Sequence, residues 1–177
     1  KDTQLKGYMP ASKGEAGRTV ELTGNGNATL NLYPKNAKQS GLKSFAVQFN
    51  GDLKTPDVPN GDLIIKISGT PKLISINEFR HNGAAGKVDL TGKVDLTYGP
   101  AWQLKGELDR FNPGFFARDF AGWVSGGFYT AGHWQDKRKD IQLSNLNLDG
   151  VIKNQPVIGR GSLSVSLNNT LNNNKAG

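Results

Sequence analysis

The chain has 177 residues, a formal net charge of +7 and no cysteine. This length fits one domain with a sizeable core, and the lack of cysteine argues against a small secreted domain held together by disulfides. No apolar run approaches the roughly 18 residues that a membrane-spanning helix needs. The unusual residue is glycine, with 23 copies, and we expect the sequence to be a piece of a longer chain.

The positive charge raises the question of a nucleic-acid partner. Lysines and arginines are spread along the sequence, and many fall at the polar positions of alternating segments, as Lys66, Lys87, Lys93 and Lys105 do. Nucleic-acid-binding proteins usually carry a clustered basic stripe with stacking aromatics. We therefore interpret the lysines as a solvated basic face and expect no nucleic-acid partner. An anionic lipid surface also attracts dispersed basic residues and stays an alternative.

Apolar and polar residues alternate along almost the whole chain, a pattern that predicts β-strands. In chain order, strands are predicted over residues 20–32, 45–53, 63–69, 74–79, 88–96, 102–108, 141–143, 146–152 and 159–167. Turns are predicted at Asn60-Gly61, at Asn82-Gly83 and at Asn112-Pro113-Gly114, because Asn-Gly and Pro-Gly are strong turn sequences. Helical periodicity is not sustained, although residues 115–120 could hold one turn.

Short turns favour antiparallel strands that are neighbours in sequence order, so the pattern predicts an all-β meander. Ten or so strands at about 4.8 Å each make a sheet that usually curls or folds over on itself. Two architectures fit this pattern: a curved open groove, and a closed β-sandwich whose apolar residues form a dry core. Residues 1–18 are predicted to be a loose segment or a lone edge strand, 19–167 a single β-module and 168–177 a polar flexible tail.

No set of residues predicts catalysis, a metal site or a cofactor. His81 and His133 lie in turn-like contexts without a partner at ligand spacing. Glu107 and Asp109 occupy the polar phase of a strand, where solvated carboxylates are the simpler interpretation. We therefore expect a protein that is not an enzyme, with no catalytic residues, no metal ligands and no cofactor.

Two segments are similar to a known family. Residues 102–116 contain Phe-Asn-Pro-Gly-Phe after an alternating strand, and residues 146–167 contain Asn-Gln-Pro between two glycine-bearing strands. Both resemble signature stretches of the TamB family, which belongs with the AsmA-like, bridge-type lipid transfer proteins. The similarity covers roughly residues 86–167, and the first 80 residues match in rhythm alone. Residues 122–140 depart from the family pattern by inserting aromatic and charged residues.

The resemblance implies a long curved antiparallel groove, a β-taco with an apolar concave interior. It also implies a periplasmic location in a Gram-negative bacterium, an inner-membrane anchor elsewhere in the chain, and phospholipid movement to the outer membrane. The implied partners are phospholipid acyl chains, a TamA-like outer-membrane barrel and unfolded outer-membrane proteins or autotransporters. The expected lining residues are Leu63, Ile65, Ile67, Val88, Leu90, Val94, Leu96, Trp102, Leu104, Leu108, Leu146, Leu148, Ile152, Leu163, Val165 and Leu167. The expected bending residues are Gly92, Gly106 and Gly150.

Two further functions stay open. A chaperone or scaffold module would offer an unpaired strand edge to β-barrel substrates by strand augmentation. A carbohydrate- or nucleic-acid-binding sandwich would need exposed aromatics on the polar phase, for which Trp123, Tyr129 and Trp134 are the candidates.

Overall fold

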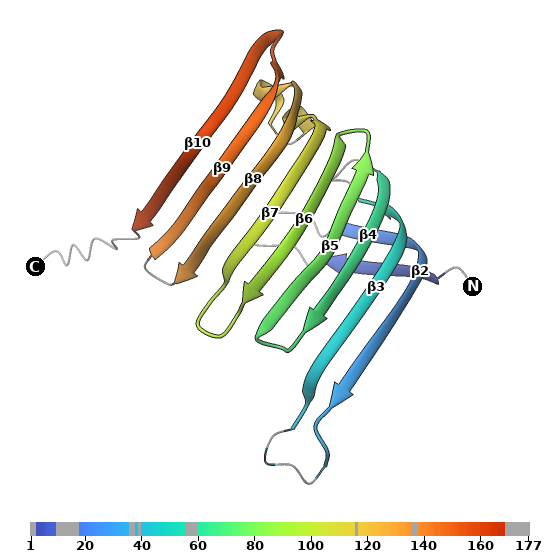
Figure 1. The fold of residues 1–177 in the computed structure, drawn as a ribbon. Coiled ribbons are helices and arrows are strands. Elements are labelled where there is room, and N and C mark those ends of the chain that lie inside the picture. The colour runs from blue at the N-terminus through green and yellow to red at the C-terminus, as the bar shows by residue number, and fades with distance from the viewer. Residues whose placement is uncertain are drawn as a thin grey trace, which may run out of the picture.

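The computed structural model describes residues 3–9, 18–35, 38, 40–55, 60–115, 117–135 and 138–168. In these residues ten strands form one antiparallel sheet whose strand order follows the chain (Figure 1). The strands are β1 (Thr3–Met9), β2 (Arg18–Leu32), β3 (Leu42–Lys54), β4 (Gly61–Gly69), β5 (Leu73–Gly83), β6 (Gly86–Asp95), β7 (Ala101–Phe111), β8 (Gly122–Gln135), β9 (Arg138–Ile152) and β10 (Gln155–Asn168). The described helical elements are the short 3-10 turns η1 (Pro113–Phe115) and η2 (Arg118–Phe120). The predicted all-β antiparallel meander is confirmed.

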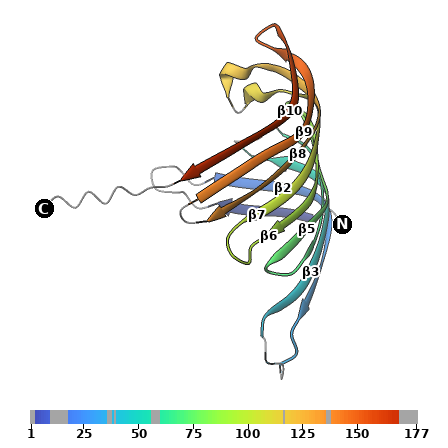
Figure 2. The same cartoon turned by 60° about the vertical axis from the view of Figure 1, so that its left-hand side comes forward.

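The sheet is a single curved layer that does not close into a barrel (Figure 2). Among the described residues, the buried apolar side chains are those of Phe49, Leu63 and Ala85, and no large side chain is less than 2% exposed. A sandwich or barrel would bury one whole face of each sheet. The closed-sandwich alternative is therefore wrong for the part of the chain that the structure describes.

Small irregularities keep the apolar residues on one face although their spacing along the sequence changes. In β5 the apolar phase runs through Ile74 and Ile76 and then shifts to Phe79, and the register slips there against both neighbouring strands. In β9 the phase shifts between Leu143 and Leu146, where Asn145 has a φ of 51°. These β-bulges insert one extra residue, so the side chains before and after them point to the same face.

The bulge in β9 corrects one sequence prediction. Residues 141–143 and 146–152 were predicted as separate strands, but they form one continuous strand. The break in alternation that separates them is the bulge at Asn145. The turn predicted at Asn82-Gly83 is also displaced, because β5 continues through Gly83 and the turn falls on Ala84 and Ala85.

Other differences concern the middle of the chain and its two ends. The sequence predicted no strand over residues 122–135, where β8 lies between β7 and β9. His81 and His133 lie inside β5 and β8 rather than in turns. Within residues 1–18, β1 pairs along the outer edge of β2. Of the tail predicted over 168–177, residues 169–177 lie outside the described part.

Candidate functional site

One face of the sheet carries almost all of the apolar side chains, and we call it the apolar face. Residues that pair directly across an antiparallel ladder share a face, so the register traces it from strand to strand. One unbroken row across nine strands consists of Ala28, Val47, Ile67, Ile76, Gly92, Leu104, Thr130, Leu143 and Leu163. A second consists of Leu30, Phe45, Gly69, Ile74, Val94, Trp102, Gly132, Ile141 and Val165.

The next row towards the other end of the strands consists of Gly26, Phe49, Ile65, Phe79, Leu90, Gly106 and Phe128. The row beyond it consists of Gly24, Gly51, Leu63, His81, Val88, Leu108, Gly126, Leu148 and Gly159. Most of the expected lining residues therefore lie in four adjacent rows. Their contact with lipid stays a prediction.

The remaining lining residues of the predicted site lie in β9, near the end of β10 and just after β6. Leu146, Ile152 and Leu167 pair with Gly161, Gln155 and Lys139, in phase with the rows above. Leu96 follows the end of β6 and is 41% exposed. Gly92 and Gly106 lie in the middle of their strands, whereas Gly150 lies near the end of β9, opposite Val124 and Val157. Their bending role stays a prediction.

Sequence reasoning missed the contribution of β8 to this face. Phe128 and Thr130 lie among the predicted residues of β7 and β9, with Gly126 and Gly132 on either side of them. On this face of β8, small and aromatic residues take the places that leucines occupy in the neighbouring strands. Trp134 also belongs here, because its ring meets that of Trp102 edge to face at 5.7 Å.

Large aromatic rings lie over glycines of the neighbouring strand. A Cβ atom built on Gly106 would collide with the Phe128 ring, and one built on Gly132 would collide with Trp102. The indole Nε1 of Trp102 donates a hydrogen bond of 3.3 Å to Thr130 Oγ1 on β8. The glycines thus make room for rings that lie along the sheet, and such rings give the face a smooth apolar surface.

The apolar face is open to a guest molecule. Where β2, β3 and β4 meet, it forms a hollow of about 270 Å³ lined by Leu22, Val47, Phe49, Ile65 and Ile67, among others. On the same face in β10, the last strand of the sheet, Leu163 and Leu167 are each 56% exposed. No described segment covers these side chains, so this face offers a continuous apolar surface to an apolar guest.

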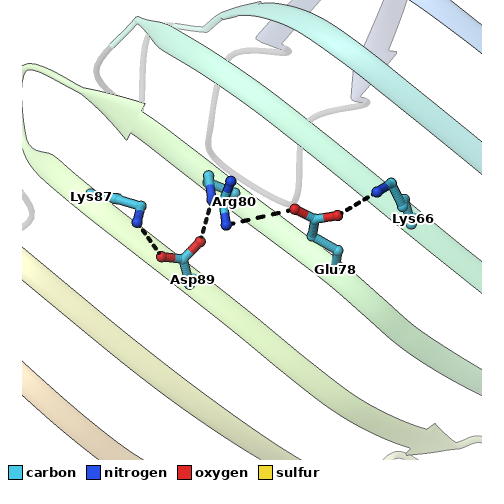
Figure 3. Close-up of polar contacts among 5 residues, drawn as sticks. All are labelled: Lys66, Glu78, Arg80, Lys87 and Asp89. Atoms are coloured by element: carbon cyan, nitrogen blue, oxygen red, sulfur yellow. Dashed lines mark hydrogen bonds and ion pairs between the residues drawn. The ribbon is translucent and has the colours of Figure 1, made fainter.

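The opposite face carries ion pairs that cross the strands (Figure 3). Glu78 accepts from Lys66 at 2.7 Å and lies 3.7 Å from Arg80. Asp89 accepts from Arg80 at 2.6 Å and from Lys87 at 2.8 Å. The chain of alternating charges joins β4, β5 and β6 beside the bulge in β5. It marks this side of the sheet as the one that faces water.

These contacts shift the protonation of both acids. The hydrogen bond from Lys66 lowers the pKa of Glu78 below its ordinary value. Burial raises the pKa of Asp89, but the hydrogen bonds from Lys87 and Arg80 outweigh it, so the pKa of Asp89 is lowered overall. Both acids are therefore charged at neutral pH, and the network is complete there.

A hollow of about 670 Å³ lies on the polar face, from the start of β5 and the end of β6 across to β10. In it His133 Nε2 is 3.1 Å from an oxygen of Asp140, and Ser166 donates a hydrogen bond to the same carboxylate. The carboxylate stands between the hydroxyl and the imidazole, whereas a serine nucleophile needs the imidazole as its direct neighbour. His133 therefore has a partner that the sequence did not reveal. Ser166, Asp140 and His133 are not arranged as a serine nucleophile beside its base.

The polar-phase aromatics proposed for a carbohydrate or nucleic-acid site separate in space. Trp123 and Tyr129 project to the polar face, where the Arg110 guanidinium lies 5.7 Å from the centre of the Trp123 ring. Trp134 lies on the apolar face instead. The structure therefore does not bring the three candidates together.

The described strands define the class of the protein: an all-β antiparallel meander in one curved sheet, with an apolar face that no other described strand covers. The model of the family described as TamB, N-terminal domain, matches residues 5–176, and the chain belongs to this family. The match includes residues 5–80, a part of the chain in which the sequence resembles the family in rhythm alone. No curated protein and no solved structure matches the chain significantly.

Family membership suggests a periplasmic protein associated with the cell envelope. None of the helices in the described residues is long and apolar enough to cross a membrane.

Proposed function

We propose that the apolar face binds the acyl chains of phospholipids and conducts them along the sheet between the inner and outer membranes. The observation that supports this most directly is the set of four apolar rows, over which the described residues form no second layer. The rows run across the strands, so a lipid can pass from one strand to the next without leaving an apolar surface. In this proposal the full-length protein is anchored in the inner membrane and assists a TamA-like barrel in inserting outer-membrane proteins.

The energetics of such a face are favourable without a shaped pocket. Each methylene group removed from water contributes about 0.8 kcal/mol, so a diacyl lipid gains enough from an extended apolar surface to compete with a bilayer. A continuous face also lets the lipid move, because neighbouring rows offer it nearly equal contacts. This accounts for the absence of a recognisable polar anchor in the predicted site.

A photo-crosslinking residue tests the proposal directly. Placed at Leu104 or Leu148 on the apolar face, it should capture phospholipid in cells. The matched controls are Gln103 and Asn147, which neighbour these leucines and point to the polar face. Equal adducts on both faces, or none on the apolar face, would contradict the proposal. Native mass spectrometry of the purified chain then identifies any bound lipid by its mass.

A second function is favoured by a separate observation, the edge of the sheet at β10. Among the described strands β10 pairs with β9 alone, and most of its described side chains are exposed. An exposed edge is a template for another strand, so the edge could hold an unfolded barrel substrate. In that case a crosslinker at Ile158, which is 71% exposed, should capture outer-membrane proteins rather than lipid.

A further inference from the structure

One end of the sheet, the lower edge in Figure 1, is where β2 leads to β3, β4 to β5, β6 to β7 and β8 to β9. We call this end of the sheet the turn edge; it comprises the described residues between these strands and the three residues of each strand from β2 to β10 that lie nearest to it. Its charges are unbalanced. The described residues include exposed lysines at Lys35, Lys38, Lys43, Lys72, Lys93 and Lys139.

The acids described at the turn edge are already engaged. Asp95 accepts a hydrogen bond of 2.8 Å from the backbone of Thr97 in its own turn. Asp140 faces His133 and Ser166. The opposite end of the sheet is closer to charge balance, because its described basic residues are accompanied by four acids, Asp52, Asp62, Asp109 and Asp119, the last of them 3.4 Å from Lys153. Positive charge therefore accumulates at one end of the strands.

Exposed apolar side chains gather at the same end. Tyr98 is 88% exposed in the turn between β6 and β7, and Leu32 is 66% exposed at the end of β2. Trp134, at the end of β8, is 46% exposed and lies under the ammonium group of Lys139, which is 5.3 Å from the ring centre. The other exposed apolar residues of the turn edge are Leu30, Leu73, Leu96 and Leu167.

We propose that the turn edge is a docking surface for an anionic phospholipid bilayer. Leucine, tyrosine and tryptophan side chains favour the boundary between headgroups and acyl chains, and lysines beside them attract anionic lipid phosphates. The apolar row nearest this edge runs alongside it, from Leu30 in β2 to Trp102 in β7 and on to β10, and Trp134 lies beyond that row at the end of β8. Docking therefore places one long side of the apolar face against the membrane. The inference goes beyond the proposed function, since an edge can bind a bilayer whether or not lipid moves along the face.

The test measures sedimentation of the 177-residue chain with vesicles that contain phosphatidylglycerol, and with vesicles of phosphatidylcholine alone. We expect binding to the anionic vesicles, weakened by salt. The variant Lys35→Gln/Lys72→Gln/Lys93→Gln should bind them at least roughly tenfold more weakly. The control Lys54→Gln/Arg118→Gln/Arg160→Gln removes the same charge away from the turn edge and should bind like the unmodified chain. Equal losses in the two variants, or no preference for anionic vesicles, would overturn the proposal.

A second pair of variants separates a bilayer from other polyanions. Leu32→Ser/Tyr98→Ser should also weaken vesicle binding, whereas Phe120→Ser/Ile158→Ser, which removes exposed apolar groups elsewhere, should not. If the first pair binds vesicles like the unmodified chain, the edge acts by charge alone and the bilayer assignment is wrong. Lipid capture at Leu104 is measured separately by crosslinking in cells, so failure of docking is distinguishable from failure of the proposed function.

Discussion

The ring of Phe128 on β8 lies directly over Gly106 on β7, where a side chain at residue 106 would begin. The same relationship joins Trp102 to Gly132 on the same two strands, with the ring now contributed by β7. Glycine is a poor strand former, and its place in a strand commonly marks the close approach of another group. Here that group is an aromatic ring. The two contacts between a ring and a glycine, one in each direction, fix how β7 and β8 pack on the apolar face.

The first prediction follows from this contact. Gly106→Ala should lower the free energy of unfolding by about 1–3 kcal/mol, because the added methyl group displaces the Phe128 ring. Gly127→Ala is the matched control on the adjacent strand, since a Cβ atom there would meet its nearest neighbour at an ordinary 3.7 Å. It should be neutral or slightly stabilising. Urea unfolding measures both, and equal effects at the two glycines would show that the ring is not seated on Gly106.

Much of the sheet could be predicted because alternation is a direct consequence of strand geometry. The phase of Leu90, Leu104 and Leu148 placed these residues on a common face, and short turns predicted the meander. The strand β8 was not predicted, because serine, glycine and threonine occupy many of its positions and its apolar and polar positions differ little in hydrophobicity. The bulges were not predicted either, because an extra residue such as Asn145 interrupts the alternation, and the interruption resembles a turn between two strands.

The second prediction concerns that bulge. Asn145 has a φ of 51°, a left-handed conformation that glycine and asparagine adopt readily and β-branched residues do not. Asn145→Gly should therefore leave the stability nearly unchanged, whereas Asn145→Val should lower the free energy of unfolding by about 1–2 kcal/mol. Thermal unfolding of the pair measures the difference. If valine is tolerated as well as glycine, the bulge does not depend on the conformation of this residue.

The third prediction concerns pH. The pKa values of Glu78 and Asp89 are lowered in the folded chain, so their contribution to stability is fully present above the pKa values of the unfolded chain. It is lost as pH falls through the lower folded values, a window that begins below about pH 4.5. We expect the variant Glu78→Gln/Asp89→Asn to lose less stability than the unmodified chain on acidification. At neutral pH its own cost should be small, because these pairs are exposed to solvent.

Salt provides the control for this network. At about 1 M salt the Debye length falls to about 3 Å, so the exposed ion pairs are screened. The difference in pH dependence between the variant and the unmodified chain should then shrink. A difference that persists unchanged at high salt would indicate that the two side chains stabilise the sheet by packing rather than by charge.

The fourth prediction compares a charge in the most buried part of the apolar face with a charge in its open part. Leu63 is 3% exposed, whereas Leu104 is partly exposed in the unbroken row across the sheet. Leu63→Asp should destabilise the fold by several kcal/mol, because its carboxylate is removed from water at the most buried position of the face. Leu104→Asp should cost much less, since its carboxylate reaches water, yet it should abolish lipid capture by a crosslinker at Leu148. Equal loss of stability in the two variants would mean that the face is covered and dry in solution, which contradicts an open lipid-binding surface.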